Sequence, residues 1–155
     1  MFRMLASLFG GPSPAGPPET LRRFTGTDQP ISAAARRESD GWRIDAKEPA
    51  SIPLFEIADA GAEQCLLTYR ARMKGEGVAQ RAYLEMWCRL PGRGEFFSKG
   101  LAQPLTGTSG WASYETPFHL KRGQRPDLIK LNLAMEGPGT IWLADIELLK
   151  TPLKG

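Results

Sequence analysis

Short runs in which apolar and polar residues alternate are the feature that most limits what this chain can fold into. The clearest runs are Arg81–Arg89 (RAYLEMWCR) and Leu128–Met135 (LIKLNLAM). Successive side chains of a β-strand point to opposite faces, so a period of two is typical of a strand with one buried face. No comparable run after residue 41 shows the roughly 3.6-residue period of an amphipathic helix. The pattern predicts an all-β domain.

Turn-forming residues separate these runs at short intervals. The chain has 17 Gly and 13 Pro, and many of them fall between the apolar segments, as in Pro91–Gly94 and Gly137–Gly139. Lys74–Gly77 is expected to be a flexible turn of the same kind. About eight short antiparallel strands at such spacing are typical of a β-sandwich or a β-barrel. The expected strands are Trp42–Ala46, Ile52–Ile57, Cys65–Met73, Arg81–Arg89, Glu95–Lys99, Tyr114–Leu120, Leu128–Met135 and Thr140–Leu149.

Composition divides the chain into three parts. Residues 1–18 are predicted to be a leader and a flexible linker, because Gly10–Pro18 (GGPSPAGPP) suits neither a helix nor a regular strand. Residues 19–41 are polar without a clear period and are expected to form an irregular arm, and residues 42–155 are expected to form the folded domain. The apolar stretch Met1–Phe9 is interpreted as a short amphipathic helix or a disordered tail. We expect a cytoplasmic protein, with export or peripheral membrane contact through the leader as alternatives.

Net charge, the length of the apolar stretches and the positions of the cysteines limit what kind of protein this can be. The formal net charge is +3 with both signs mixed along the chain, whereas a nucleic-acid binder usually concentrates many more Lys and Arg residues. No apolar stretch reaches the roughly 20 residues that a transmembrane helix needs, so no transmembrane segment is expected. Cys65 and Cys88 lie within apolar runs and are expected to be buried free thiols, with a disulfide as the alternative.

Residues that could carry catalysis are sparse. His119 is the only histidine, so a metal site with several His ligands is excluded. The two cysteines lack the spacing of a zinc knuckle or a redox Cys-x-x-Cys motif, and no phosphate-binding loop, nucleophile elbow or dinucleotide fingerprint is present. We therefore expect a protein that is not an enzyme and that needs no cofactor or catalytic metal.

Alternation also assigns side chains to faces. The side predicted to be buried consists of Cys65, Leu67, Tyr69, Ala71 and Met73, then Ala82, Leu84, Met86 and Cys88, and finally Ile129, Leu131, Leu133 and Met135. If these strands share one sheet, its outer face gathers two aromatic rings together with several charged and amide groups. The predicted site residues on that face are Arg70, Arg72, Tyr83, Glu85, Trp87, Lys130 and Asn132.

A face of this composition suits a polyhydroxylated ligand. The rings of Tyr83 and Trp87 can stack on the apolar faces of a sugar while charged and amide side chains bond its hydroxyl groups. The same residues could instead form cross-strand pairs or lie under the N-terminal arm. Two other functions stay open: a protein-interaction or sensor module, and weak binding of single-stranded nucleic acid, against which the modest net charge argues.

The C-terminal part of the sequence carries a further pattern. Trp111–Leu149 begins with Trp-x-x-Tyr, continues through the strand-like Ile129–Leu133 and finishes as Gly-x-Gly-x-hydrophobic-Trp-hydrophobic-x-Asp-hydrophobic-x-Leu. This stretch resembles the C-terminal half of galactose-binding-like jelly-roll domains, which include carbohydrate-binding modules and related bacterial domains. The resemblance extends loosely back to Trp42. It implies a jelly-roll β-sandwich that binds carbohydrate without catalysing a reaction.

One acid of the family pattern is missing. The finishing strand of such domains often reads Trp-x-Asp-Asp, and metal-containing relatives use acids near it to hold a structural calcium ion, but here Ala144 replaces the first acid. Calcium takes about six to eight oxygen ligands, so we expect no metal at Asp145 and interpret it as a hydrogen-bonded structural carboxylate. Trp42, Trp111 and Trp142 are expected to anchor the core or to pack loops.

Overall fold

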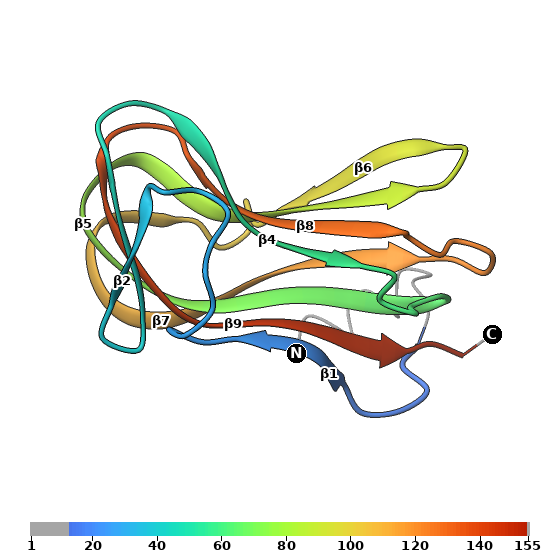
Figure 1. The fold of residues 1–155 in the computed structure, drawn as a ribbon. Helices are drawn as coiled ribbons and strands as arrows, with labels where there is room; N and C mark the ends of the chain where they lie inside the picture. The colour runs from blue at the N-terminus through green and yellow to red at the C-terminus, as the bar shows by residue number, and fades with distance from the viewer. Residues whose placement is uncertain (1–12, 155) are drawn as a thin grey trace.

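One long strand, β5 (Cys65–Leu90), organises the fold by passing from one layer of sheet to the other (Figure 1). The computed structural model describes residues 13–154. The first half of β5 pairs with β7 (Leu105–Leu120) and β9 (Gly139–Pro152). The second half pairs with β6 (Gly94–Lys99) and β8 (Leu128–Met135), again antiparallel. β5 is therefore the shared strand of a two-layered sandwich.

The remaining strands widen the two layers at their edges. In the first layer, β3 (Gly41–Ala46) and β1 (Glu19–Phe24) lie along the far side of β9, and β2 (Ala35–Glu38) pairs with β3. In the second layer, β4 (Ala50–Ala58) pairs with β8. The predicted all-β class and antiparallel sandwich are confirmed. Within residues 13–154 there is no helix of the length and apolar character needed to cross a membrane.

After residue 41 the strand predictions hold for most of the chain and differ from the structure at the start of β7 and at the bend in β5. β7 starts at Leu105, well before the predicted Tyr114. The prediction of two strands joined by a turn at Lys74–Gly77 was wrong, because β5 stays paired with β7 through this segment by way of three register shifts. Gly77 and Gln80 adopt positive φ angles of 60° and 56°, which let the backbone bend without ending the strand.

Side-chain alternation changes phase across this bend. Up to Met73 the odd-numbered residues of β5 face the core, whereas from Ala82 onward the even-numbered residues do so. Both halves of β5 therefore direct one side into the same core, and their other sides lie on the outer sides of different layers. This change of phase decides where the outward side chains lie.

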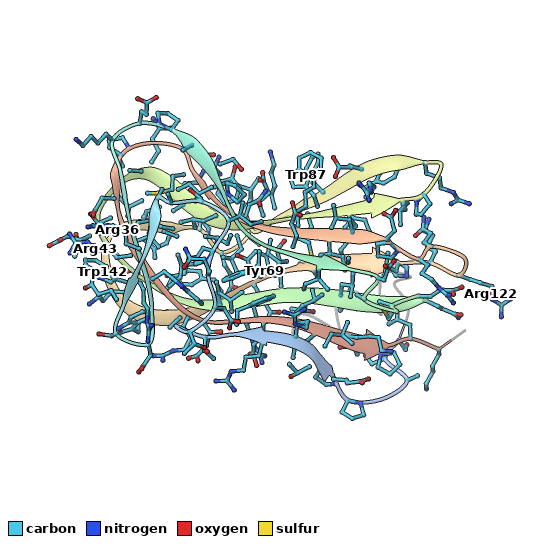
Figure 2. The ribbon with its side chains drawn as sticks, viewed as in Figure 1. Arg36, Arg43, Tyr69, Trp87, Arg122 and Trp142 are labelled. Atoms are coloured by element: carbon cyan, nitrogen blue, oxygen red, sulfur yellow. The ribbon has the colours of Figure 1, made fainter. Side chains whose placement is uncertain are left out.

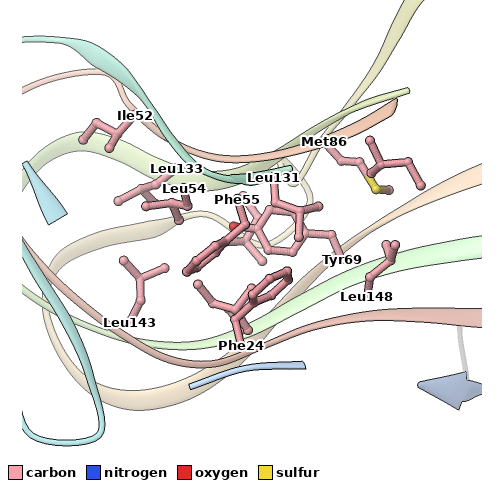
Figure 3. Close-up of a cluster of buried hydrophobic side chains, with 14 of the residues drawn as sticks. Phe24, Ile52, Leu54, Phe55, Tyr69, Met86, Leu131, Leu133, Leu143 and Leu148 are labelled. Atoms are coloured by element: carbon pink, nitrogen blue, oxygen red, sulfur yellow. The ribbon is translucent and has the colours of Figure 1, made fainter. Parts of the chain in front are cut away.

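The inner faces of the two layers form a single core (Figure 3). Every residue that the alternation assigned to the buried side is buried in the structure, so that prediction is confirmed. Tyr69 carries a hydroxyl group into this core and donates it to the backbone oxygen of Asn132 at 3.2 Å, which ties the first layer to the second. Burial raises the pKa of this phenol, so it remains a neutral donor.

The N-terminal segment is part of the sandwich, and the prediction of an irregular arm over residues 19–41 was wrong. β1 pairs with β9, and the ring of Phe24 stacks on Phe55 of β4 with centroids 4.1 Å apart. Trp42 meets the same Phe55 ring edge-on at 5.4 Å. β1 escaped prediction because it is an edge strand that buries one large side chain, so it shows little alternation.

The chain preceding β1 also touches the fold. The backbone nitrogen of Ala15 donates to the oxygen of Pro152 at 2.7 Å, and that of Lys154 donates to the oxygen of Ser13 at 3.0 Å. The last residues of the predicted linker therefore run beside the C-terminal strand. The predicted leader helix or tail, Met1–Phe9, lies outside the described residues.

Candidate functional site

The seven predicted site residues do not share one face. Arg70 and Arg72 project from the first half of β5 and lie on the outer side of the first layer. Tyr83, Glu85 and Trp87 project from the second half and lie on the outer side of the second layer, together with Lys130 and Asn132 of β8. Figure 2 shows Trp87 above the second layer, far from Trp142 and Arg43 at the end of the molecule that holds β2 and β3. The bend in β5 separates the two groups.

On the second layer, the polar members of the predicted site bond to one another. Glu85 and Asn132 are buried, and the Asn132 amide donates to Glu85 Oε1 at 3.1 Å. The Ser51 hydroxyl donates to the same oxygen at 2.9 Å, and Lys99 Nζ lies 3.9 Å from Oε2. Tyr83 is also buried, with 7% of its surface exposed. Most of this group is therefore occupied with internal contacts.

The outermost members of that group are paired as well. Trp87 is half-buried and its ring packs against Phe97 of β6, with centroids 5.2 Å apart. Lys130 Nζ lies 2.9 Å from Glu95 Oε2. These are the cross-strand contacts that the sequence left open as an alternative.

The outer side of the first layer carries a row of alternating cations and indole rings. Crossing the strands from β3 to β7, the row consists of Arg43, Trp142, Lys74 and Trp111, and we call it the aromatic row. Lys74 Nζ lies 4.4 Å from the ring centroid of Trp142 and 5.8 Å from that of Trp111. The Arg43 guanidinium lies 5.1 Å from the Trp142 centroid. Cations near the faces of indole rings are attracted by the ring quadrupole, so these contacts fix how the rings stand on the sheet.

A polar cluster lies beside the aromatic row. Arg72 stands next to Lys74 on the same face of β5, and its guanidinium lies 5.2 Å from the Trp111 centroid. Asp145 occupies a register shift in β9 with a φ angle of 52°. Its carboxylate accepts from Arg23 at 3.0 Å and lies 3.6 Å from Arg72. The expectation that Asp145 is hydrogen-bonded is confirmed.

Ion pairing balances most of the charge on this face. Arg70 binds Glu147 at 3.0 Å, in the same way that Arg23 and Arg72 share Asp145. Arg43 contacts Asp45 at 3.2 Å. Lys74, by contrast, has no ion-pair partner among residues 13–154 and contacts the two rings instead. The face therefore presents many hydrogen-bonding groups without a large excess of either sign.

The aromatic row borders a hollow of about 370 Å³. Its lining includes both indoles of the row, Arg72 and Lys74 from β5, Asp145 from β9, and the β2–β3 turn from Glu38 to Gly41. Two further hollows, of about 280 and 300 Å³, meet the first at Asp145. The three hollows adjoin one another on the outer side of the first layer, and we call them together the groove. The first hollow is in the size range of ligand sites.

The sequence analysis missed the two tryptophans that define this groove. Trp42 is buried as predicted, but Trp111 is 42% exposed and Trp142 is half-buried, so the expectation of a core or loop-packing role was wrong for Trp111. Alternation around Trp142 contains the missing signal, because Ile141 and Leu143 take the core side and leave the indole outward. Trp111 lies in the part of β7 that was not predicted as a strand, so its face could not be assigned.

Groups suited to metal binding do not gather in the described chain. Among residues 13–154 no three His, Cys, Asp or Glu side chains are placed to share a metal ion. His119, the only histidine of the chain, is exposed on β7. The indole rings and charged side chains that line the groove can supply stacking and hydrogen bonding to a ligand.

Comparison with known proteins finds solved structures of similar fold. No family model matches the sequence, and neither does any curated protein. Among solved structures, the xylan-binding CBM22-1 domain of Paenibacillus barcinonensis Xyn10C matches with a TM-score of 0.58 and 9% identity, covering 89% of this chain and 98% of that one. The family 30 carbohydrate-binding module of a Clostridium thermocellum cellulosomal cellulase matches with a TM-score of 0.50 and 15% identity, covering 89% and 88%. A family 16 carbohydrate-binding module matches with a TM-score of 0.51 and 13% identity, covering 74% and 79%.

At identities this low, the likeness concerns the fold. The chain has the jelly-roll sandwich fold of carbohydrate-binding modules. The fold implied by the resemblance of Trp111–Leu149 is confirmed.

Proposed function

We propose that this domain is a non-catalytic module that binds a neutral polysaccharide chain along the aromatic row. The observation that carries the proposal is the pair of outward indoles, Trp142 and Trp111, beside a hollow rich in hydrogen-bonding groups. The structural neighbours described as carbohydrate-binding modules support the same function, one of them being xylan-binding.

The spacing of the two rings suits a polymer. Trp142 on β9 and Trp111 on β7 are two strands apart, which is about 10 Å at the usual separation of paired strands. This is close to the length of a disaccharide, so two sugar rings of one chain can each meet an indole. The apolar C–H face of a sugar stacks on an aromatic ring, and Arg72, Ser113 and Asp145 lie within the adjoining hollows to bond hydroxyl groups.

The charge pattern favours a neutral ligand. Arg23, Arg70, Arg72 and Arg43 each have a carboxylate partner, so a polyanion would have to compete with these ion pairs. A single-stranded nucleic acid would neutralise several phosphates, and its binding would fall steeply as salt rises. Binding of a neutral glycan should change little with salt, because few counterions are released.

Titration calorimetry against soluble xylan, mixed-linkage β-glucan, galactan and single-stranded DNA tests the proposal. We expect one neutral glycan to bind with a dissociation constant between about 10 μM and 1 mM, as suits a shallow open groove. The affinity should be nearly the same at low and high sodium chloride. Absence of binding to every glycan would favour the protein-interaction alternative, and salt-sensitive binding of DNA alone would favour the nucleic-acid alternative.

Two tryptophan variants locate the site. Trp111→Ala removes an exposed ring of the aromatic row, so it should abolish glycan binding and leave the unfolding midpoint almost unchanged. Trp87→Ala is the matched control, because it removes a tryptophan from the opposite outer side. The reverse outcome, loss of binding with Trp87→Ala alone, would locate the ligand on the second layer among the residues first predicted from the sequence.

A further inference from the structure

Strand β6 is an exposed sheet edge that contains neither a proline nor a register shift, and its two charged residues, Glu95 and Lys99, have opposite signs. Within residues 13–154 it pairs on one side, with β5, in an uninterrupted register from Gly94 to Lys99. The other edge strands are interrupted or charged: β4 contains Pro53 and a register shift, β7 contains Pro117, β1 contains a register shift, and three of the four residues of β2 (ARRE) are charged. Proline, bulges and charge are the features that normally stop an edge from recruiting another strand.

β6 also exposes large apolar side chains. Phe96 is 44% exposed, Phe97 is 55% exposed and Leu101, just after the strand, is 42% exposed. Phe97 lies on the outer side with Trp87, whereas Phe96 pairs with Cys88 and lies on the core side. β6 forms a hairpin with the end of β5 at the upper right of Figure 1, where it is an outermost strand of its layer. Apolar side chains on both sides of an open edge suit burial against a partner strand.

The sequence of β6 is complementary to itself. Antiparallel pairing of two β6 strands centred on Phe97 places Glu95 of each copy opposite Lys99 of the other. Phe97 then faces Phe97 across the two-fold axis. Odd-numbered residues of β6 lie on the outer side, so the two charge pairs and the ring pair fall on one face of the combined sheet. Opposite charges and paired aromatics directly across strands are stabilising arrangements.

We propose that two copies of this chain associate edge to edge through β6, forming a continuous sheet across a two-fold axis. In the single chain, Glu95 already contacts Lys130 at 2.9 Å and Lys99 lies 3.9 Å from Glu85. The new pairs extend these contacts into a charge network across the axis. This association does not depend on the proposed glycan site, which lies on the other layer.

Dimerisation would give one particle two glycan grooves. When two weak sites bind one polymer, the second binding event is intramolecular, and the overall affinity rises without a new contact. A module that binds sugars weakly therefore gains from being dimeric.

Sedimentation of the full chain from micromolar to millimolar concentration tests the association, and we expect a monomer–dimer equilibrium. Glu95→Lys and Lys99→Glu each place like charges opposite one another, so each variant should weaken the dimer about tenfold or more. An equimolar mixture of the two variants should restore dimerisation as a heterodimer, because each β6 then meets the opposite charge at both positions. Circular dichroism melting of each variant checks that both exposed substitutions leave the fold intact.

Several results would overturn the proposal. A wild-type chain that stays monomeric at millimolar concentration would exclude it, and so would a mixture that remains as monomeric as the separate variants. Nuclear magnetic resonance spectra of the wild type at increasing concentration give a test without substitution. Shifts should appear at residues 94–101, and shifts confined to another surface would contradict pairing through β6. Failure of glycan binding would leave all these results unchanged.

Discussion

The ammonium group of Lys74 lies 4.4 Å from the ring centroid of Trp142, its direct neighbour across β5 and β9. The same indole donates its Nε1 hydrogen to Glu38 at 3.2 Å and has Arg43 beside it on β3. Contacts from three strands therefore hold the ring before any ligand arrives. A side chain that is already ordered loses less conformational entropy on binding, so the aromatic row is preorganised for stacking.

Lys74→Met tests the role of this cation, because methionine retains an unbranched apolar chain and removes the charge. We expect the free energy of unfolding to fall by no more than about 1 kcal/mol, the size of an exposed cation–π contact. Glycan affinity should fall several-fold, because the indoles lose a support and the ligand loses a hydrogen-bond donor. Calorimetry measures the affinity, and Lys130→Met on the second layer serves as the control that should bind normally. Equal binding by both variants would show that Lys74 does not contribute to the site.

Phe24→Ala tests whether the N-terminal strand is part of the folded unit. Phe24 is 3% exposed and stacks on Phe55, so truncation should cost about 3–5 kcal/mol as a large core ring is lost. Ile31→Ala is the control, because Ile31 is 54% exposed and its truncation should cost less than about 0.5 kcal/mol. Urea unfolding at constant pH measures both. A small effect at Phe24 would mean that β1 contributes little to the stability of the sandwich.

The core was predictable from sequence because each strand has to bury one side. Alternation is clear in β8, where Ile129, Leu131 and Leu133 fill the core as predicted. The period of two shows which side of a strand is buried from that strand's own sequence, so the buried residues can be predicted without knowing which strands pair. It also reported the outward direction of Arg70 and Trp87 correctly.

The candidate site was not predictable in the same way. Its residues come from several strands, and the sequence does not show which strands have their outward sides on the same layer. Arg70 and Trp87 both point outward, but the bend between Met73 and Ala82 sends them to different layers. The buried positions change from odd to even across this segment, but such a change fits a turn between two separate strands as well as a bend within one strand. The place of Trp111 in the site could not be predicted for the same reason. Trp111 lies beside Lys74 only because β5 pairs with β7.

Protonation of Asp45 at low pH should weaken the end of the sandwich where β3 pairs with β9. The Thr140 hydroxyl donates to this carboxylate at 2.7 Å and Arg36 donates at 2.6 Å. The Thr140 hydrogen bond and the Arg43 and Arg36 contacts hold the pKa of Asp45 below its ordinary value. A carboxyl whose pKa is lower in the folded state stabilises the fold above its ordinary pKa, and this contribution is lost as the pH falls further.

We therefore expect the urea midpoint to fall as the pH drops below about 4, where carboxyl groups of this type take up protons. Asp45→Asn should lower the midpoint slightly at neutral pH and make it less dependent on pH in the acid range. The effect is small because 38% of the Asp45 side-chain surface is exposed and its ion pairs are screened by water. Identical pH profiles for wild type and variant would show that Asp45 contributes no stability.

The two cysteines should be unreactive in the folded protein and reactive once it unfolds. Cys65 and Cys88 are free thiols with 1% and 0% of their surfaces exposed, as the alternation predicted. Burial raises the pKa of Cys65 to about 11 and that of Cys88 to about 12. The thiolate is the nucleophile, so near pH 8 only a small fraction of either group could react even if a reagent reached it.

A chromogenic disulfide reagent should therefore label neither thiol rapidly in buffer and both rapidly in denaturant. Fast labelling of the native chain would mean that the core opens readily around β5, and fewer than two thiols in denaturant would show that the pair had been oxidised.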